Sequence, residues 1–271
     1  MSSDAAILQE HYRKFITGCH ILHYQDVLDA YGHLSFRHPQ KPDVFIMSQY
    51  IAPALVSSKD DLIEYWVKDA EPVDPTRGKG YSERCIHSEL YKKYPGVKSV
   101  IHSHSEAVVP YTISGVPMRA CCHMGGFVGT QTPNFDIAHH LKPTDKKDLL
   151  VRNTHLGGAL ASHFSTGDSS TPEHAVVLMR GHGFTVQGES IEEAVLRAVY
   201  TQKNASIQTT ALLTRAAHAN GRFSSVPEIK YLDEGEIQGA TLMTQESVYR
   251  PWGLWVKEVE SHSFYVNKEV Q

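Results

Sequence analysis

The chain has 271 residues, of which 41% are hydrophobic and 21% are charged, a balance typical of a globular protein with a sizeable core. Its formal net charge of −4 at pH 7 argues against a nucleic-acid partner, because such a partner requires a basic surface. No apolar run approaches the length of a membrane span, and the first residues lack the apolar core of a secretion signal, so we expect no membrane partner. The four cysteines form no CxxC pair, so we expect free thiols and a reducing, cytoplasmic location.

Helices and short strands alternate in the first hundred residues. Apolar side chains from Ala6 to Cys19 recur at helical spacing, and a second helix is predicted to run toward Ala30 and to end at Gly32. Short apolar stretches predict strands at 34–36, 44–47 and 62–67, and a helix is predicted at 83–94.

The second half of the chain is dominated by one long helix. It is predicted at 190–217, where Ser190 and Glu193 form a capping box and an apolar stripe follows. The other predicted elements are a strand from 117, a loop at 135–148, a helix at 153–164, a strand at 175–179 and a helix in the tail after 231. The chain contains no glycine-rich nucleotide-binding motif.

Two histidines follow an apolar stretch that predicts a buried strand. His102 and His104 are two residues apart, so on a strand they project from one face while Ser103 projects from the other. Such a pair is suited to metal binding, and His182, which follows a second apolar run, is a candidate third ligand. The alternative is a pair of hydrogen-bonded or solvated histidines on a sheet, because the chain contains 17 histidines. The glycines that flank His182 favour a tight turn with close backbone approach.

Glu83 stands at the start of a predicted helix and is a candidate acid/base residue. The alternative is a carboxylate stabilised by the helix dipole. His87 shares a helix face with Glu83, either as its hydrogen-bond partner or as a residue satisfied elsewhere. Further histidines are predicted to lie on the surface: His20, His23, His139, His140 and His218.

In combination, the motifs resemble the class II aldolase/adducin family. The matching segments are Gly-His-Leu-Ser-Phe-Arg at 32–37, Ser-Glu at 82–83, Ile-His-Ser-Glu at 86–89, Pro95, His-Ser-His at 102–104 and Arg-Gly-His-Gly at 180–183. Their order and spacing agree with the family over roughly residues 6–220.

The resemblance implies a fold, a metal and an assembly. The expected fold is a three-layer α/β/α class II aldolase-like domain around a mainly antiparallel sheet, spanning residues 1–271 with a C-terminal extension from about 220. It also implies one divalent ion per subunit (Zn, Mn or Fe) on His102, His104 and His182, with Glu83 as catalytic acid/base or fourth ligand. Relatives are typically homotetramers with shared active sites. The aromatic residues of the tail are candidate interface anchors, although each could instead pack on its own subunit.

The implied function is a metal-dependent carbon–carbon lyase acting on a small carboxylic acid or carbonyl compound. Sugar-phosphate members carry a cradle of hydroxyl and glycine residues, which is incomplete here because Tyr81 replaces a serine and the stretch 47–53 lacks a Thr-Gly pair. The sequence therefore favours the branch that decarboxylates an aromatic, muconate-type or keto carboxylic acid through a metal-stabilised enolate. The residues predicted to bind substrate are His33, Ser82, Arg37 and His123, although Arg37, Arg84 and Arg180 could equally form structural ion pairs.

Three other functions fit the same resemblance. A class II aldolase would cleave a hydroxy-carbonyl substrate, and an Fe(II)-dependent oxygenase would consume oxygen. A non-catalytic, adducin-like binding protein is the least favoured, because loss of the histidines is expected in that class and this chain keeps all three.

Overall fold

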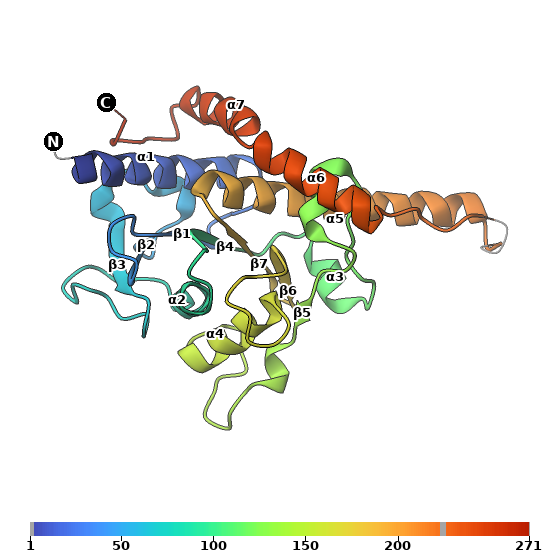
Figure 1. Cartoon of the computed structure of the whole chain (residues 1–271), viewed down its shortest axis with the longest axis horizontal. Coiled ribbons are helices and arrows are strands. Elements are labelled where there is room, and N and C mark those ends of the chain that lie inside the picture. Colours follow the sequence, from blue (N-terminus) through green and yellow to red (C-terminus); the bar gives the residue numbers. More distant parts are fainter. Residues whose placement is uncertain (1–2, 223–225, 271) are drawn as a thin grey trace.

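The computed structural model describes residues 3–222 and 226–270, which form a sheet enclosed between two layers of helices (Figure 1). The seven strands lie in the order β3-β2-β1-β4-β7-β6-β5. Their bounds are β1 His33–Arg37, β2 Val44–Ser48, β3 Leu62–Trp66, β4 Ser99–Ser103, β5 Asn134–Phe135, β6 Val176–Met179 and β7 Gly183–Gly188. Every neighbouring pair is antiparallel except β5 and β6, so the predicted mainly antiparallel sheet is confirmed.

The two helical layers cover opposite faces of the sheet (Figure 1). Helices α1 and α5 pack together against one face, α7 lies outside them, and α2 and α4 pack against the other face. The bounds are α1 Ser3–Tyr24, α2 Arg84–Lys93, α3 Val109–Ile113, α4 Thr154–Ala161, α5 Ile191–Ala219, α6 Glu234–Glu246 and α7 Tyr249–Glu260. Among the described residues, no helix is both long and apolar enough to cross a membrane.

The strands are apolar on both faces because each face is covered. In β2, Ile46 packs in the core formed with α1 and α5, whereas Phe45 and Met47 pack in the core formed with α2 and α4. In β4, Ile101 and Val100 divide between the two cores in the same way. Alternation of side chains along a strand therefore explains why these stretches are continuous apolar runs.

Two predicted elements in the first half of the chain differ from the structure. The helix predicted up to Ala30 is absent, because α1 ends at Tyr24 and Asp26 takes a left-handed backbone conformation (φ 56°) that stops it. The segment from 117 is extended but joins no sheet. Its backbone instead pairs with side-chain amides of α5: Asn204 bonds to Arg119 and Cys121, and Gln208 bonds to Pro117 and Arg119.

The long helix is confirmed, but its predicted capping box is only half formed. The Ser190 hydroxyl accepts a hydrogen bond from the Glu193 backbone N–H. The Glu193 carboxylate accepts from the backbone N–H of Glu189 rather than of Ser190, and it pairs with Arg197 at 2.7 Å. The tail contains two helices, α6 and α7, instead of the single predicted one.

The surface position predicted for His20 is wrong. The side chain is 2% exposed, because it lies on the face of α1 that packs on the chain near Val56, and its Nε2 hydrogen-bonds to the Val56 carbonyl at 2.8 Å. Burial lowers the pKa of His20 to about 4, against the ordinary value of 6.5.

Acid should therefore destabilise the fold through His20. Below pH 6.5 the unfolded chain takes up a proton on this side chain while the folded protein does not, so the free energy of unfolding falls down to about pH 4. The loss is about 3 kcal/mol, and His20→Gln should remove that part of the pH dependence. Urea denaturation between pH 7 and pH 4 measures it, with His139→Gln at an exposed position as the control. An unchanged pH slope in His20→Gln would contradict the expectation.

Candidate active site

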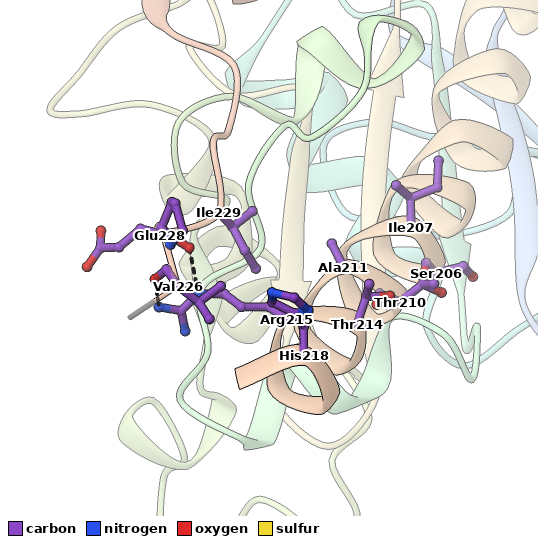
Figure 2. Close-up of a pocket in the computed structure, with 11 residues that line it drawn as sticks. Ser206, Ile207, Thr210, Ala211, Thr214, Arg215, His218, Val226, Glu228 and Ile229 are labelled. Carbon is purple, nitrogen blue, oxygen red and sulfur yellow. Dashed lines mark hydrogen bonds between the residues drawn. The ribbon is translucent and has the colours of Figure 1, made fainter. Parts of the chain in front are cut away.

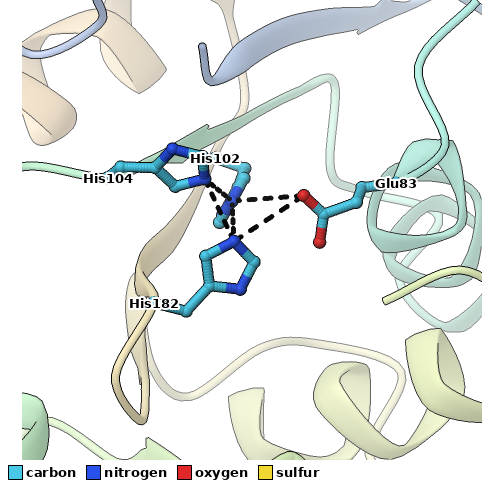
Figure 3. Close-up of side chains that lie close together, drawn as sticks. All are labelled: Glu83, His102, His104 and His182. Carbon is cyan, nitrogen blue, oxygen red and sulfur yellow. Dashed lines mark hydrogen bonds and ion pairs between the residues drawn. The ribbon is translucent and has the colours of Figure 1, made fainter. Parts of the chain in front are cut away.

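Three histidines, two from the end of β4 and one from far along the chain, converge at one end of the sheet (Figure 3). His102 lies in β4, His104 follows the last residue of β4, and His182 lies in the turn between β6 and β7. The Nε2 atom of His104 is 3.0 Å from those of both His102 and His182, which are 3.3 Å from each other. The predicted convergence of the three rings is confirmed, although His104 lies just beyond the strand.

The turn that carries His182 can approach β4 because of its glycines. Gly181 adopts a left-handed conformation with φ of 65°, which glycine permits without strain. A Cβ atom on Gly183 would lie 2.0 Å from the Ser103 carbonyl oxygen, so no larger residue fits there. Pairing of β7 with β4 then holds the turn beside His102.

The Nε2 atoms of the three imidazoles face one another, and that of His102 presents a free lone pair. Nδ1 of His102 lies 3.1 Å from the Phe184 carbonyl, so it carries the ring proton and leaves Nε2 unprotonated. Burial lowers the pKa of all three rings, that of His182 to about 4 and that of His102 well below its ordinary value, so they are neutral at neutral pH. Neutral imidazoles whose Nε2 atoms converge in this way are suited to hold a cation between them.

This donor set fits a divalent metal ion. In a tetrahedral site, nitrogen ligands about 2.1 Å from the ion lie about 3.4 Å from one another. The observed separations of 3.0–3.3 Å are close to that value, and one carboxylate oxygen of Glu83 lies within 4.8 Å of all three nitrogens. Imidazole nitrogens bind Zn, Mn and Fe alike, so the donors do not select one metal.

The Glu83 carboxylate faces the histidines rather than its own helix. Glu83 precedes the first residue of α2, but its side chain makes no capping hydrogen bond there. One carboxylate oxygen accepts from the Val151 backbone N–H at 2.9 Å, and the other lies 3.8 Å from Nε2 of His102 and 3.7 Å from Nε2 of His182 (Figure 3). Burial raises the pKa of Glu83 to about 7, although the Val151 hydrogen bond opposes the shift. The group can therefore both hold and release a proton near neutral pH.

A cavity of about 610 Å³ opens beside Glu83 and His104. Its wall contains three tyrosines, several apolar side chains and the polar residues His33, Ser82, Glu83 and His104. The residues are Ala30, Tyr31, Gly32, His33, Tyr50, Ile51, Ala52, Tyr81, Ser82, Glu83, His104 and Leu150. The tyrosines at 31 and 50 were not predicted, because nothing in their local sequence distinguishes them from ordinary loop residues.

The predicted substrate residues divide into two groups. His33 and Ser82 line the cavity. Arg37 does not, and its assignment to substrate is corrected: the guanidinium is buried and donates to the backbone carbonyls of Val97, Pro42 and Tyr91. His123 is exposed on the short helix His123–Val128 and forms no part of this cavity wall.

The other two arginines act as structural residues. Arg84 donates to the Ala70 carbonyl, and Arg180 pairs with Asp136 at 2.7 Å. Neither forms part of the cavity wall. His87 is fully buried and is not the partner of Glu83, since it bonds to His33 and Ser35.

A second hollow, of about 710 Å³, lies far along α5, where this helix projects from the body (Figures 1 and 2). Its wall combines the last turns of α5 with the segment 226–229, which is attached through hydrogen bonds from Arg215 to the carbonyls of Val226 and Pro227. Although it is larger, its described residues include no cluster of metal-ligating side chains. The candidate metal-ligating cluster lies instead beside the cavity at Glu83.

Comparisons with known proteins agree with the fold and identify the family. Residues 13–209 match the family described as Class II Aldolase and Adducin N-terminal domain. The chain is 55% identical over 256 residues to the decarboxylase tropJ of Talaromyces stipitatus, covering 94% of this chain and 96% of that protein. It is 30% identical to a 3,4-dihydroxyphthalate decarboxylase of Arthrobacter keyseri over 59% of each chain. The fold resembles an L-fuculose 1-phosphate aldolase structure from Glaciozyma antarctica, with a TM-score of 0.73, 17% identity and coverage of 98% and 96% of the two chains.

The fold and the matched sequence place the chain in the class II aldolase/adducin family. Within that family it is an enzyme of the lyase class, as its similarity to named decarboxylases shows.

Proposed function

We propose that this enzyme is a metal-dependent decarboxylase of an aromatic, muconate-type or keto carboxylic acid. The observation that supports it most is the joint placement of three neutral imidazoles and a carboxylate with a pKa of about 7 at the end of a tyrosine-lined cavity. The 55% identity to a decarboxylase over nearly the whole chain supports the same reaction.

His102, His104 and His182 hold the metal in this proposal. A divalent ion bound there supplies Lewis acidity, which draws electron density from a substrate oxygen beside it. The protein keeps the three ligands neutral through burial, so the ion retains its full positive charge.

Glu83 supplies the proton that completes the reaction. The bond between the carboxyl carbon and its neighbour breaks, carbon dioxide leaves, and the electron pair remains on the neighbouring carbon. That carbon then takes a proton from the Glu83 carboxyl, whose raised pKa keeps it partly protonated near neutral pH. The Val151 N–H fixes one oxygen of the group, so the other faces the reacting centre.

The cavity wall favours a planar acid over a sugar phosphate. Tyr31, Tyr50 and Tyr81 provide aromatic surface for stacking against a ring or a conjugated chain. Tyr81 stands where sugar-phosphate members carry a serine, and its hydroxyl donates to the Ile51 carbonyl. Because Arg37, Arg84 and Arg180 lie outside the wall, recognition of a substrate carboxylate falls to the metal, His33 and Ser82.

A screen for carbon dioxide release tests the reaction. Protein purified without added metal is analysed for Zn, Mn and Fe and is then assayed with hydroxy-aromatic, muconate-type and keto acids. We expect one metal ion per subunit and release of carbon dioxide in proportion to substrate consumed. Cleavage of a hydroxy-carbonyl compound without carbon dioxide would indicate an aldolase, and oxygen uptake with an iron requirement would indicate an oxygenase.

A homotetramer with sites shared between subunits is part of the proposal. Of the aromatic residues in the tail, Trp252 and Trp255 pack in the core of their own subunit. Tyr249 and Phe264 are 67% and 56% exposed and are the remaining interface candidates. We expect light scattering to give a tetramer whose activity falls on dilution, and a fully active monomer would contradict this expectation.

A further inference from the structure

Four buried side chains form a hydrogen-bonded chain that begins in the core and ends at the cavity. The Tyr91 hydroxyl lies 2.7 Å from Ser35 Oγ, which lies 2.7 Å from Nδ1 of His87. Nε2 of His87 is in turn 2.6 Å from Nδ1 of His33, whose ring forms part of the cavity wall. Tyr91, Ser35, His87 and His33, here called the relay, are each at most 3% exposed. The proposed reaction assigns no task to the first three.

The partners of each group fix the direction of these hydrogen bonds. Among the described residues, Ser35 is the hydrogen-bond partner of the buried Tyr91 hydroxyl, so this hydroxyl donates its proton to Ser35 Oγ. Ser35 then donates its own proton to Nδ1 of His87. Burial lowers the pKa of His87 to about 3, so the ring is neutral and its one proton lies on Nε2, which donates to Nδ1 of His33.

This direction assigns the tautomer of His33. Nδ1 accepts a hydrogen bond from His87 and is therefore unprotonated, so the ring proton lies on Nε2. Among the residues that the structure describes, no other residue hydrogen-bonds with Nε2 of His33, and the ring lies 5.1 Å from that of His102, centroid to centroid. We infer that the relay fixes His33 as a neutral hydrogen-bond donor to an oxygen of the substrate, with Ser35, His87 and Tyr91 as positioning residues.

This inference rests on the proposed function for the identity of the oxygen, which belongs to the substrate carboxylate or the adjacent carbonyl. A donor fixed in advance lowers the cost of organising the site when substrate binds. It also keeps His33 from coordinating the metal, because a protonated Nε2 has no lone pair to offer. The relay thus gives His33 a different role from the three metal-binding histidines: it binds substrate and not the metal.

Side-chain ¹⁵N NMR of the zinc-loaded protein tests the arrangement without substrate. Nitrogen shifts distinguish a protonated from an unprotonated ring nitrogen, and His33→Gln identifies the His33 signals by their loss. We expect the proton of His33 on Nε2 in the wild type and a mixture of both tautomers in Ser35→Ala. The control is Ser99→Ala, which removes another buried hydroxyl, bonded to the Ser35 carbonyl, and should leave the His33 signals unchanged.

The variant Tyr91→Phe tests the direction of the hydrogen bonds in the relay, because it removes the phenol hydroxyl and retains the shape of the core. Ser35 can still donate to His87 in this variant, so the His33 proton should stay on Nε2. In the opposite direction Ser35 would lose its acceptor, and the tautomer would switch. A wild-type proton on Nδ1, or an unchanged tautomer in Ser35→Ala, would overturn the inference.

Kinetics separate this inference from the proposed function. With an active substrate, Ser35→Ala should lower kcat/KM by on the order of tenfold, the effect of one hydrogen bond to a charged group, and Ser99→Ala should not. Equal losses in both variants would overturn the relay. An enzyme that shows the expected tautomers but releases no carbon dioxide would refute the decarboxylase proposal and support the relay.

Discussion

Replacing Glu83 by Gln is expected to lower turnover by on the order of 10²–10⁴ while metal and substrate still bind. The amide has nearly the same shape, and its oxygen can still accept the hydrogen bond from Val151. It cannot deliver a proton, so the carbon left by carbon dioxide must be protonated by water. Single-turnover kinetics measure the turnover rate and substrate binding, and metal analysis measures the bound metal.

The matched control for this variant is Glu89→Gln. Glu89 lies in α2, the helix that begins directly after Glu83, and is buried, but it faces Lys92 at 3.4 Å and is absent from the cavity wall. Its variant should retain near-normal turnover. Near-normal turnover in Glu83→Gln as well would leave this carboxylate without a catalytic role.

Replacing His104 by Ala should remove the bound metal and the activity together while the fold persists. Two of three nitrogen ligands remain, and a site with so few ligands does not hold a divalent ion at micromolar concentration. His104 lies after the end of β4 and is partly exposed, so its loss leaves no large cavity in the core. Mass spectrometry of the metal content tests the loss of the ion, and thermal unfolding tests whether the fold persists.

His139→Ala provides the comparison, because this histidine is exposed and lies outside the site. It should retain one metal ion per subunit and full activity. A His104→Ala protein that still carries one metal ion per subunit would refute the assignment of the ligands.

The sequence by itself determined the parts of the site that depend on local geometry. Side chains alternate along a strand, so the spacing of His102 and His104 after an apolar run was enough to predict that the rings meet. The glycines around His182 predicted a close turn, because a residue without a Cβ atom lets the backbone approach its neighbour. Local sequence also located most helices and strands, because apolar periodicity reflects which face of an element is buried.

Only the tertiary structure decided which distant residues meet. Arg37 was a reasonable carboxylate partner in the sequence, yet its position in β1 directs it toward the carbonyls at the end of α2. The extended segment from 117 pairs with amide side chains of α5, a contact that no local pattern encodes. His87 shares a helix face with Glu83, but packing of α2 on β1 joins it to His33 and Ser35 instead. Each outcome depends on strand order and on helix packing, which bring together residues far apart in the chain, whereas a sequence pattern reports only on its neighbours.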